Sequence, residues 1–82
     1  MSLSLSSDPE LLLQALAMQM PFGKYSGSYL IDLPEPYLVW FNRQGFPEGK
    51  LGGALALAYE VKLNVLEAEI RPMVMHYINT RK

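Results

Sequence analysis

The sequence predicts a small α+β domain that is mostly helical and carries one short β-hairpin, in the order helix, hairpin, helix, long helix and short C-terminal helix. Apolar residues recur every three or four positions over two stretches, residues 11–20 and 50–70, which is the spacing of a buried helix face. Between these stretches, tyrosines with strand preference stand beside Gly23 and Gly27. Glycine permits the positive φ of a tight turn, so this segment is expected to form two short strands.

The first helix is expected over residues 9 to about 19. Ser7 or Asp8 offers an N-cap oxygen, and Pro9 suits the first turn because its missing N–H has no partner there. Its inward stripe, set by i, i+3, i+4 spacing, consists of Leu12, Ala15, Leu16 and Met20. Pro21 is expected to end the helix.

The hairpin is expected to have strands over about residues 21–25 and 28–31, joined by a tight turn at Ser26-Gly27. An isolated hairpin is only marginally stable in water, so this one has to lie on the helices. The lysine and glycines of residues 23–27 also suggest a phosphate-binding loop. The segment lacks the spacing of a Walker A loop, however, and a hairpin turn explains the glycines equally well.

The next helix is expected over Glu35–Gln44, with Asp32 as a cap, two prolines at its start and Gly45 as its C-cap. Its aromatic and apolar side chains fall on two neighbouring faces, Leu38 with Phe41 and Tyr37 with Trp40. Residues 46–49 contain proline and glycine and are expected to form a turn.

The longest element is expected to begin near Lys50 and to continue to about Ile70. A polar stripe runs along it and consists of Glu60, Asn64, Glu67 and Arg71, with apolar residues on both flanks. A surface helix needs only one apolar flank, so this helix is either covered on both sides by the fold or paired through one flank with another chain. Small residues that would allow a hairpin or helix to approach closely are Gly52, Gly53, Ala54, Ala56 and Ala58. Pro72 is expected to end or kink the helix, and residues 73–78 to add a last short helix.

Length and composition indicate one domain over residues 1–82, with residues 1–7 frayed. The chain is 50% hydrophobic and only 18% charged, so either the core is unusually complete or some apolar surface meets a partner. A net charge of −1 argues against a strongly basic nucleic-acid platform and against a binder of anionic membranes. There is no cysteine, no apolar run long enough to span a membrane and no signal-peptide pattern, so a cytoplasmic location is expected.

No cluster of residues in the sequence points to catalysis, a cofactor or a bound metal. His76 is the only histidine, and without a cysteine to share a metal site it is expected to be a packing or surface residue. Glu60 and Glu67 share a helix face and could flank a substrate. Pairing of Glu67 with Arg71 at i, i+4 gives that stripe a structural purpose instead. The protein is therefore expected not to be an enzyme.

One combination of residues favours binding, and it mixes aromatic and basic side chains: Lys24, Tyr25, Trp40, Arg43 and Lys50. If the hairpin packs on the helices, these side chains converge into a surface of the kind that stacks bases and contacts phosphates. The alternative is that the aromatic residues belong to the core and the cations are ordinary surface residues.

An ordered string of motifs spans residues 20–72. It comprises Met20-Pro21-Phe22-Gly23-Lys24-Tyr25, Leu30-Ile31-Asp32-Leu33-Pro34, Tyr37-Leu38, Trp40-Phe41, Gly45-Phe46-Pro47, Leu51-Gly52 and Glu60-Val61-Lys62-Leu63-Asn64. The string resembles a family of short bacterial proteins labelled "putative quorum-sensing-regulated virulence factor", and this resemblance implies a bacterial source. A shorter pattern, Phe22-Gly23-Lys24-Tyr25 with the later Leu33-Pro34 and the Tyr37-Leu38 pair two residues before Trp40, is similar to the C-terminal segment of some DnaQ-like exonucleases. That similarity implies nucleic-acid contact for Phe22, Lys24, Tyr25 and Trp40.

Two positions differ from the pattern of that family. Ser26 stands where a second lysine is common, which weakens the basic surface. Val65 stands where a glycine commonly follows the asparagine. Glycine there would suit a helix end, whereas valine favours continuation of the long helix through this position.

The leading functional hypothesis is a non-enzymatic interaction module with a protein partner or with self-association, including a homodimer through the second apolar flank of the long helix. The alternative hypothesis is weak binding of single-stranded nucleic acid by Lys24, Tyr25, Trp40 and Arg43. No cofactor is expected under either hypothesis.

Overall fold

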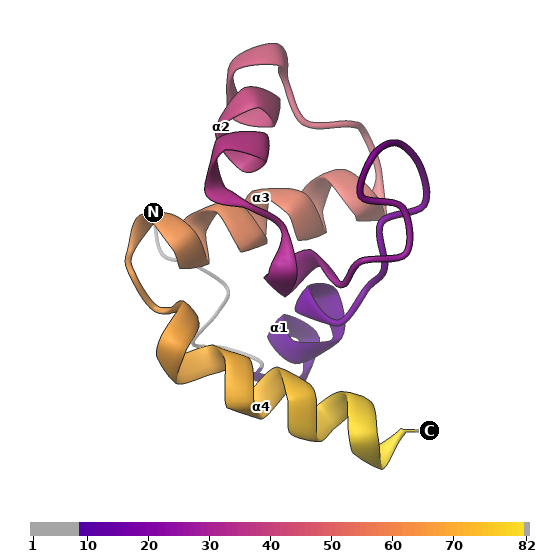
Figure 1. Ribbon diagram of the computed structural model, residues 1–82, viewed down its shortest axis with the longest axis vertical. Coiled ribbons are helices and arrows are strands. Elements are labelled where there is room, and N and C mark those ends of the chain that lie inside the picture. Colours follow the sequence, from indigo (N-terminus) through magenta and orange to yellow (C-terminus); the bar gives the residue numbers. More distant parts are fainter. Residues whose placement is uncertain (1–8, 82) are drawn as a thin grey trace.

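Helices account for all the regular structure of residues 9–81, the part of the chain that the computed structural model describes (Figure 1). Four α-helices and one short 3₁₀-helix occur within that range: α1 (Pro9–Leu16), η2 (Leu30–Asp32), α2 (Glu35–Gln44), α3 (Lys50–Leu63) and α4 (Glu67–Thr80). Because residues 9–81 contain no β-strand, the fold is all-α and the predicted α+β class is wrong. The expected fraying of residues 1–7 and the expected caps Ser7 and Asp8 lie outside the described residues.

The predicted hairpin is replaced by a loop with a single isolated β-bridge, between Gln19 and Tyr29. Two backbone hydrogen bonds, each 2.8 Å long, flank this bridge. The ladder extends no further toward the loop because the chain turns there: Ser28 N–H donates to the Tyr25 carbonyl at 3.0 Å, and Gly27 N–H donates to the Met20 carbonyl at 2.7 Å in its place. The expected turn is present, and Gly27 takes the positive φ of +89° that it requires.

Burial of neighbouring residues explains why the second expected strand is a 3₁₀-helix. Leu30 and Ile31 are adjacent in the chain, and both are buried in the core. A strand would point them to opposite faces, and one of the two would then leave the core. The tight turn of η2 buries both side chains.

Helix α1 ends at Leu16, three residues before the expected end at Gln19. Met20 precedes Pro21, and the proline ring pushes the residue before it out of helical geometry into extended backbone. The bridge at Gln19 continues that extended conformation toward the helix. Pro21 therefore shortens α1 because the extended backbone that it imposes reaches back to Gln19.

Helix α2 has the predicted bounds, Glu35–Gln44, and its predicted C-cap, Gly45, is confirmed with a φ of +102°. The predicted cap at its other end is wrong. Pro34 occupies the N-cap position without a side-chain hydrogen bond, and Asp32 forms an ion pair with Arg71 instead.

The predicted long helix is broken at Asn64, Val65 and Leu66, so residues 50–70 do not form one element. The break is a Schellman motif, in which Leu66 N–H donates to the Val61 carbonyl at 2.9 Å and Val65 N–H donates to the Lys62 carbonyl at 3.1 Å. Val65 holds the left-handed position of this motif, with a φ of +56°. The expectation that valine continues the helix is therefore wrong.

Pro72 lies inside α4 and does not end it. Because the break has moved to residues 64–66, a new helix starts at Glu67 and Pro72 falls within its second turn. Residues 73–78, expected as a separate short helix, simply continue α4.

Helix α3 lies at the centre of the fold, with α2 packed on one side and α1 on the other, while α4 packs against α1 and η2 (Figure 1). The buried apolar residues come from every helix, from the loop between α1 and η2 and from the link between η2 and α2: Leu16, Met20, Leu30, Ile31, Leu33, Leu38, Phe41, Ala54, Leu55, Ala58, Val61 and Val74. Leu55 lies on one flank of α3 and Ala58 on the other, and both are buried. The fold itself therefore covers both apolar flanks of α3 along this part of the helix.

Candidate functional site

A row of aromatic rings extends from the loop after α1 to the middle of α3. We call it the aromatic row, and its successive ring centroids are 4.7, 5.1, 6.3 and 6.2 Å apart along Tyr25, Tyr37, Phe41, Phe46 and Tyr59. Phe41 is 6% exposed, so the row is anchored in the core. Three of these contacts are tilted or edge-to-face, and Phe41 and Phe46 are stacked with their planes 16° apart; rings favour both kinds of arrangement over direct face-to-face overlap.

Trp40 lies on the outer side of α2 and contacts the aromatic row through one of its members. Its ring meets the Phe41 ring edge-on, with centroids 5.1 Å apart. Trp40 is nevertheless 53% exposed. The core thus holds one edge of the indole in place while the rest of the ring faces solvent.

Tyr25 and Trp40 do not form the shared outward surface that was considered for them. Tyr25 is half-buried and packs on Tyr37, whereas Trp40 is exposed on α2. Tyr25 supports the packing of the loop, and Trp40 is a surface residue.

Burial raises the pKa of the Tyr37 hydroxyl above its ordinary value, and the nearby hydroxyl of Tyr25 raises this pKa further. Tyr37 is the second ring of the aromatic row and lies between Tyr25 and Phe41. A phenolate in this position would lose solvation and face a second phenol. Tyr37 thus remains a neutral packing residue across the physiological pH range.

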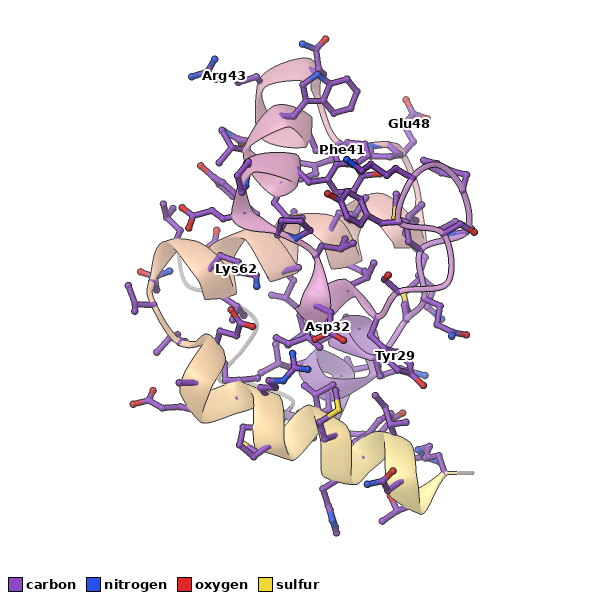
Figure 2. All side chains as sticks on the ribbon, in the orientation of Figure 1. Tyr29, Asp32, Phe41, Arg43, Glu48 and Lys62 are labelled. Atoms are coloured by element: carbon purple, nitrogen blue, oxygen red, sulfur yellow. The ribbon has the colours of Figure 1, made fainter. Side chains whose placement is uncertain are left out.

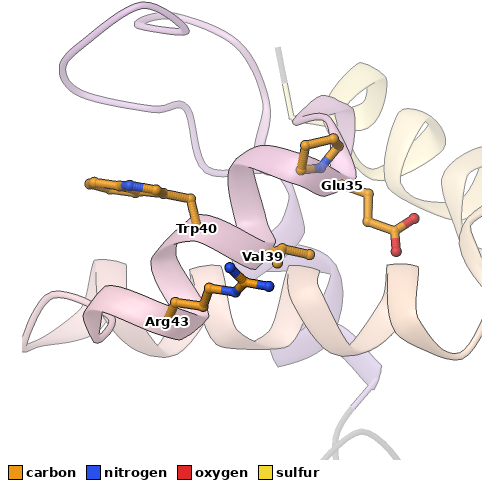
Figure 3. Close-up of a pocket in the computed structure, with 5 residues that line it drawn as sticks. Glu35, Val39, Trp40 and Arg43 are labelled. Atoms are coloured by element: carbon orange, nitrogen blue, oxygen red, sulfur yellow. The ribbon is translucent and has the colours of Figure 1, made fainter.

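The outer face of α2 carries a shallow, open groove of about 440 Å³ (Figure 3). We call it the α2 groove, and its lining residues are Glu35, Pro36, Val39, Trp40 and Arg43. Glu35 stands at one end and Arg43 at the other, with the valine between them (Figure 3). The α2 groove thus has apolar residues at its centre and one acid and one base at its ends.

The five residues proposed from the sequence fall into separate groups. Lys24 lies over the Tyr25 ring, with its Nζ 5.6 Å from the centroid. Trp40 and Arg43 line the α2 groove together. Lys50 is exposed at the start of α3 and lines neither this groove nor the second groove described below.

The positive side chains divide into paired and unpaired sets. Lys62, Arg71 and Arg81 each form an ion pair with an acid. Lys24, Arg43 and Lys50 form no ion pair with any residue between 9 and 81. Within residues 9–81, the arginines and lysines without an acidic partner are thus the three that the sequence singled out.

A second groove, of about 480 Å³, lies where α2, α3 and α4 meet. Its lining residues are Glu35, Lys62, Val65, Glu67, Ala68 and Arg71, and Glu35 is shared with the α2 groove. Ion pairs occupy most of its polar groups. Lys62 Nζ lies 2.7 Å from Glu67 Oε1, and Arg71 bonds Asp32 (Asp32 and Lys62 are labelled in Figure 2).

The expected pairing of Glu67 with Arg71 is confirmed, with 3.8 Å between Arg71 Nη1 and Glu67 Oε2. Sequence reasoning missed the contact of Arg71 with Asp32, which joins residues 39 positions apart. Nothing in local spacing signals such a pair. Glu67 therefore takes part in an ion-pair network, and Glu60 and Glu67 lie on two different helices, α3 and α4, so the expected shared helix face is wrong.

His76 is exposed on α4. No group of three or more histidine, cysteine, aspartate or glutamate residues that could hold a metal ion occurs among residues 9–81. None of the helices within the same residues has the length and apolar character needed to cross a bilayer.

The chain is similar to one described protein family and to two curated proteins of Escherichia coli. Residues 8–73 match the family described as "Putative quorum-sensing-regulated virulence factor". Over 67 residues the chain is 43% identical to "Uncharacterized protein YpeB" of Escherichia coli strain K12, covering 80% of this chain and 93% of that protein. The protein of the same name from Escherichia coli O157:H7 matches with the same figures. No solved structure matches the chain. The matched residues include the aromatic row and the α2 groove.

Proposed function

The chain belongs to the "Putative quorum-sensing-regulated virulence factor" family, and from its surface we propose that it is a cytoplasmic, non-enzymatic interaction module that binds a protein through the α2 groove. The observation that carries this proposal is the position of Trp40. A large aromatic side chain is held edge-on by Phe41 and yet leaves 53% of its surface in solvent. Tryptophan and arginine are the residue types that most often dominate the energetics of protein interfaces.

The chemistry of the α2 groove agrees with this role. Pro36, Val39 and Trp40 provide an apolar centre, and Glu35 and Arg43 provide a charged rim. A desolvated apolar centre inside a polar rim is the usual anatomy of a protein–protein interface. Neither Glu35 nor Arg43 forms an ion pair with residues 9–81, so both charges are available to a partner.

Site-specific photo-crosslinking in the native cell tests this proposal. Benzoylphenylalanine at position 36, inside the α2 groove, is expected to give a discrete crosslinked protein band, and adding Trp40→Ala is expected to remove it. The matched control places the same residue at Met73, which is 49% exposed on α4. Absence of a band from position 36, or the same bands from both positions, would contradict the proposal.

A second candidate, weak binding of single-stranded nucleic acid, is favoured by the unpaired cations. Lys24 and Arg43 are free of acidic partners within residues 9–81, and Tyr25 and Trp40 offer ring faces near them in sequence. Base stacking on aromatic rings with phosphate contacts from cations is how such proteins bind single strands. The half-buried position of Tyr25 leaves Trp40 and Phe22, which are 53% and 49% exposed, as the aromatic rings open to stacking.

Titration of the Trp40 fluorescence with a single-stranded oligonucleotide tests this second candidate. Phosphate contacts are strongest at low ionic strength, so the measurement belongs at about 10 mM salt. Quenching that Arg43→Gln weakens would support nucleic-acid binding. An unchanged signal at that ionic strength would eliminate it.

A further inference from the structure

The two charged residues of the α2 groove are placed symmetrically about its middle. Glu35 and Arg43 are eight residues apart on one helix, which corresponds to about 12 Å along the helix axis. Val39 lies midway between them in the sequence and also lines the groove. One end of the groove is therefore negative, the other is positive, and the centre is apolar.

Two copies of such a surface are complementary to each other when one copy is rotated by a two-fold operation relative to the other. If two α2 helices lie antiparallel, Glu35 of each copy faces Arg43 of the other, and the two Val39 side chains meet on the axis. The same arrangement places the Trp40 ring of one copy over the Pro36 end of the other. A two-fold axis through Val39 makes both halves of the contact identical, as an isologous dimer requires.

Resting on the binding role proposed above, we propose that the α2 groove binds a second copy of this chain, with the two α2 helices antiparallel. Charge complementarity selects this occupant, because Glu35 and Arg43 make no ion pair with residues 9–81 and each would gain one in the dimer. Two other surfaces that a partner could use are already filled: the middle of α3 is covered by α1 and α2, and the second groove is occupied by its own ion pairs.

The dimer is weak. Helix α2 has ten residues, so a contact along it buries less than the roughly 800 Å² per partner of a standard stable interface. Dissociation constants from micromolar to about 1 mM correspond to such a contact. Association is therefore measured at high protein concentration.

Charge reversal with sedimentation equilibrium tests the proposal. Glu35→Arg alone places two arginines at each contact, and Arg43→Glu alone places two glutamates there. Each single variant is expected to weaken the dimer at least tenfold. The double variant, Glu35→Arg with Arg43→Glu, restores both ion pairs in reversed order and is expected to return within about threefold of the unmodified chain.

Mixing the two single variants gives the sharpest measurement. A chain with arginine at positions 35 and 43 complements a chain with glutamate at both, so the mixture is expected to form heterodimers although neither component associates alone. Circular dichroism confirms that each variant is folded, since each change removes a favourable interaction with the α2 dipole. A structural role of Glu35 or Arg43 would not produce association on mixing.

A cysteine variant keeps the proposal testable if a charge variant does not fold. The chain contains no cysteine, so Val39→Cys introduces a single thiol beside the two-fold axis. Under mild oxidation it is expected to form the covalent dimer at least tenfold faster than Met73→Cys on α4. Equal rates for the two variants would overturn the antiparallel arrangement.

The remaining outcomes separate this inference from the proposed function. A clean monomer at about 1 mM, or a mixture of single variants that stays monomeric, overturns the homodimer. If position 36 then still crosslinks to a different protein in a Trp40-dependent way, the interaction module stands and its occupant is not a second copy. Oligonucleotide binding by a monomeric chain overturns the homodimer as well.

Discussion

Gly52 is held against the carbonyl group of Pro47 in the loop between α2 and α3. A Cβ at position 52 would overlap that carbonyl, whereas a Cβ at Gly53 would meet nothing within 4 Å. Gly52 is buried and Gly53 is exposed, although both lie in the first turns of the same helix. The two adjacent glycines therefore have opposite roles.

Alanine substitutions at these two positions are expected to change stability in opposite directions. Gly52→Ala forces α3 away from the loop and is expected to lower the free energy of unfolding by about 2 kcal/mol or more. Gly53→Ala improves helix propensity without a clash and is expected to raise it by about 0.5–1 kcal/mol. Urea denaturation of both variants measures the difference, and equal effects would contradict the close approach at Pro47.

Tyr37 is expected to make stability depend on alkaline pH. Its pKa is raised in the folded protein, so the unfolded chain loses the proton first as pH rises through the ordinary tyrosine value of about 10. The stabilisation is complete below that pH and is lost as pH rises further. Urea midpoints between pH 9 and 11 are expected to fall less steeply for Tyr37→Phe, and parallel curves would show that the hydroxyl is not the cause.

Sequence reasoning identified small residues in α3 as a place of close approach but assigned the wrong neighbour. It expected a hairpin or a helix, and the contact at Gly52 is the loop carbonyl of Pro47. It also identified Trp40 and Arg43, which do share a groove, because i, i+3 spacing on a helix fixes their proximity. Contacts such as Arg71 with Asp32 depend on how separate elements pack, and no local spacing encodes them.

At the scale of elements, the turn between α3 and α4 decides the course of the second half of the chain. Leu66 is partly buried against the core and follows Val65, which is 84% exposed and left-handed. A β-branched residue in this conformation is sterically unfavourable by roughly 1–2 kcal/mol. The Schellman hydrogen bonds and the burial of Leu66 offset that cost.

Val65→Gly is expected to stabilise the protein by about 1 kcal/mol, because glycine adopts the positive φ without strain and the exposed valine contributes little packing. The matched control is Met73→Gly, within α4 and also exposed, which is expected to destabilise by roughly 1 kcal/mol. Thermal unfolding followed by circular dichroism measures both. Destabilisation by Val65→Gly would mean that residue 65 is not left-handed in solution.

Helix boundaries were predictable where a proline or a glycine stands at the helix end. Helix α2 begins after a proline and ends at a glycine, and both bounds agree with the sequence pattern. The break between α3 and α4 was not predictable in this way, because valine locally disfavours the left-handed conformation that Val65 adopts at this helix end. Tertiary packing of Leu66 and α4 overrides that preference.

At the scale of the whole molecule, one apolar cluster unites every helix. Leu55 of central α3 is fully buried within it, together with residues from α1, η2, α2 and α4. A single core of this kind in a small domain favours cooperative unfolding without populated intermediates. The opposite charges of the α2 groove lie outside this cluster and therefore do not contribute to its cohesion.

Leu55→Ala is expected to lower the free energy of unfolding by about 3 kcal/mol through loss of buried contacts and formation of a cavity. Far-ultraviolet circular dichroism reports the helices, and near-ultraviolet circular dichroism reports the tyrosines of the aromatic row. The two signals are expected to give the same urea midpoint before and after the substitution. Separate midpoints would show that α4 or the loop unfolds independently of the core.

The fold class was predicted wrongly for one reason, which concerns residues 21–31. Tyrosines and glycines there satisfy the local preferences of a hairpin, and the turn at Gly27 does form. The tight turn takes the Ser28 N–H and limits the pairing to one bridge, and the joint burial of Leu30 and Ile31 requires a helical turn. In so small a protein, the need to bury adjacent apolar side chains in the core thus outweighs their strand propensity.

Trp40 is the only tryptophan in the chain, and its ring already lies half in water in the folded state. Unfolding therefore changes the surroundings of the indole much less than it would for a buried ring. The wavelength of tryptophan emission is consequently a poor measure of unfolding in this protein. It is a sensitive measure of binding at α2, because a ligand there would cover the indole.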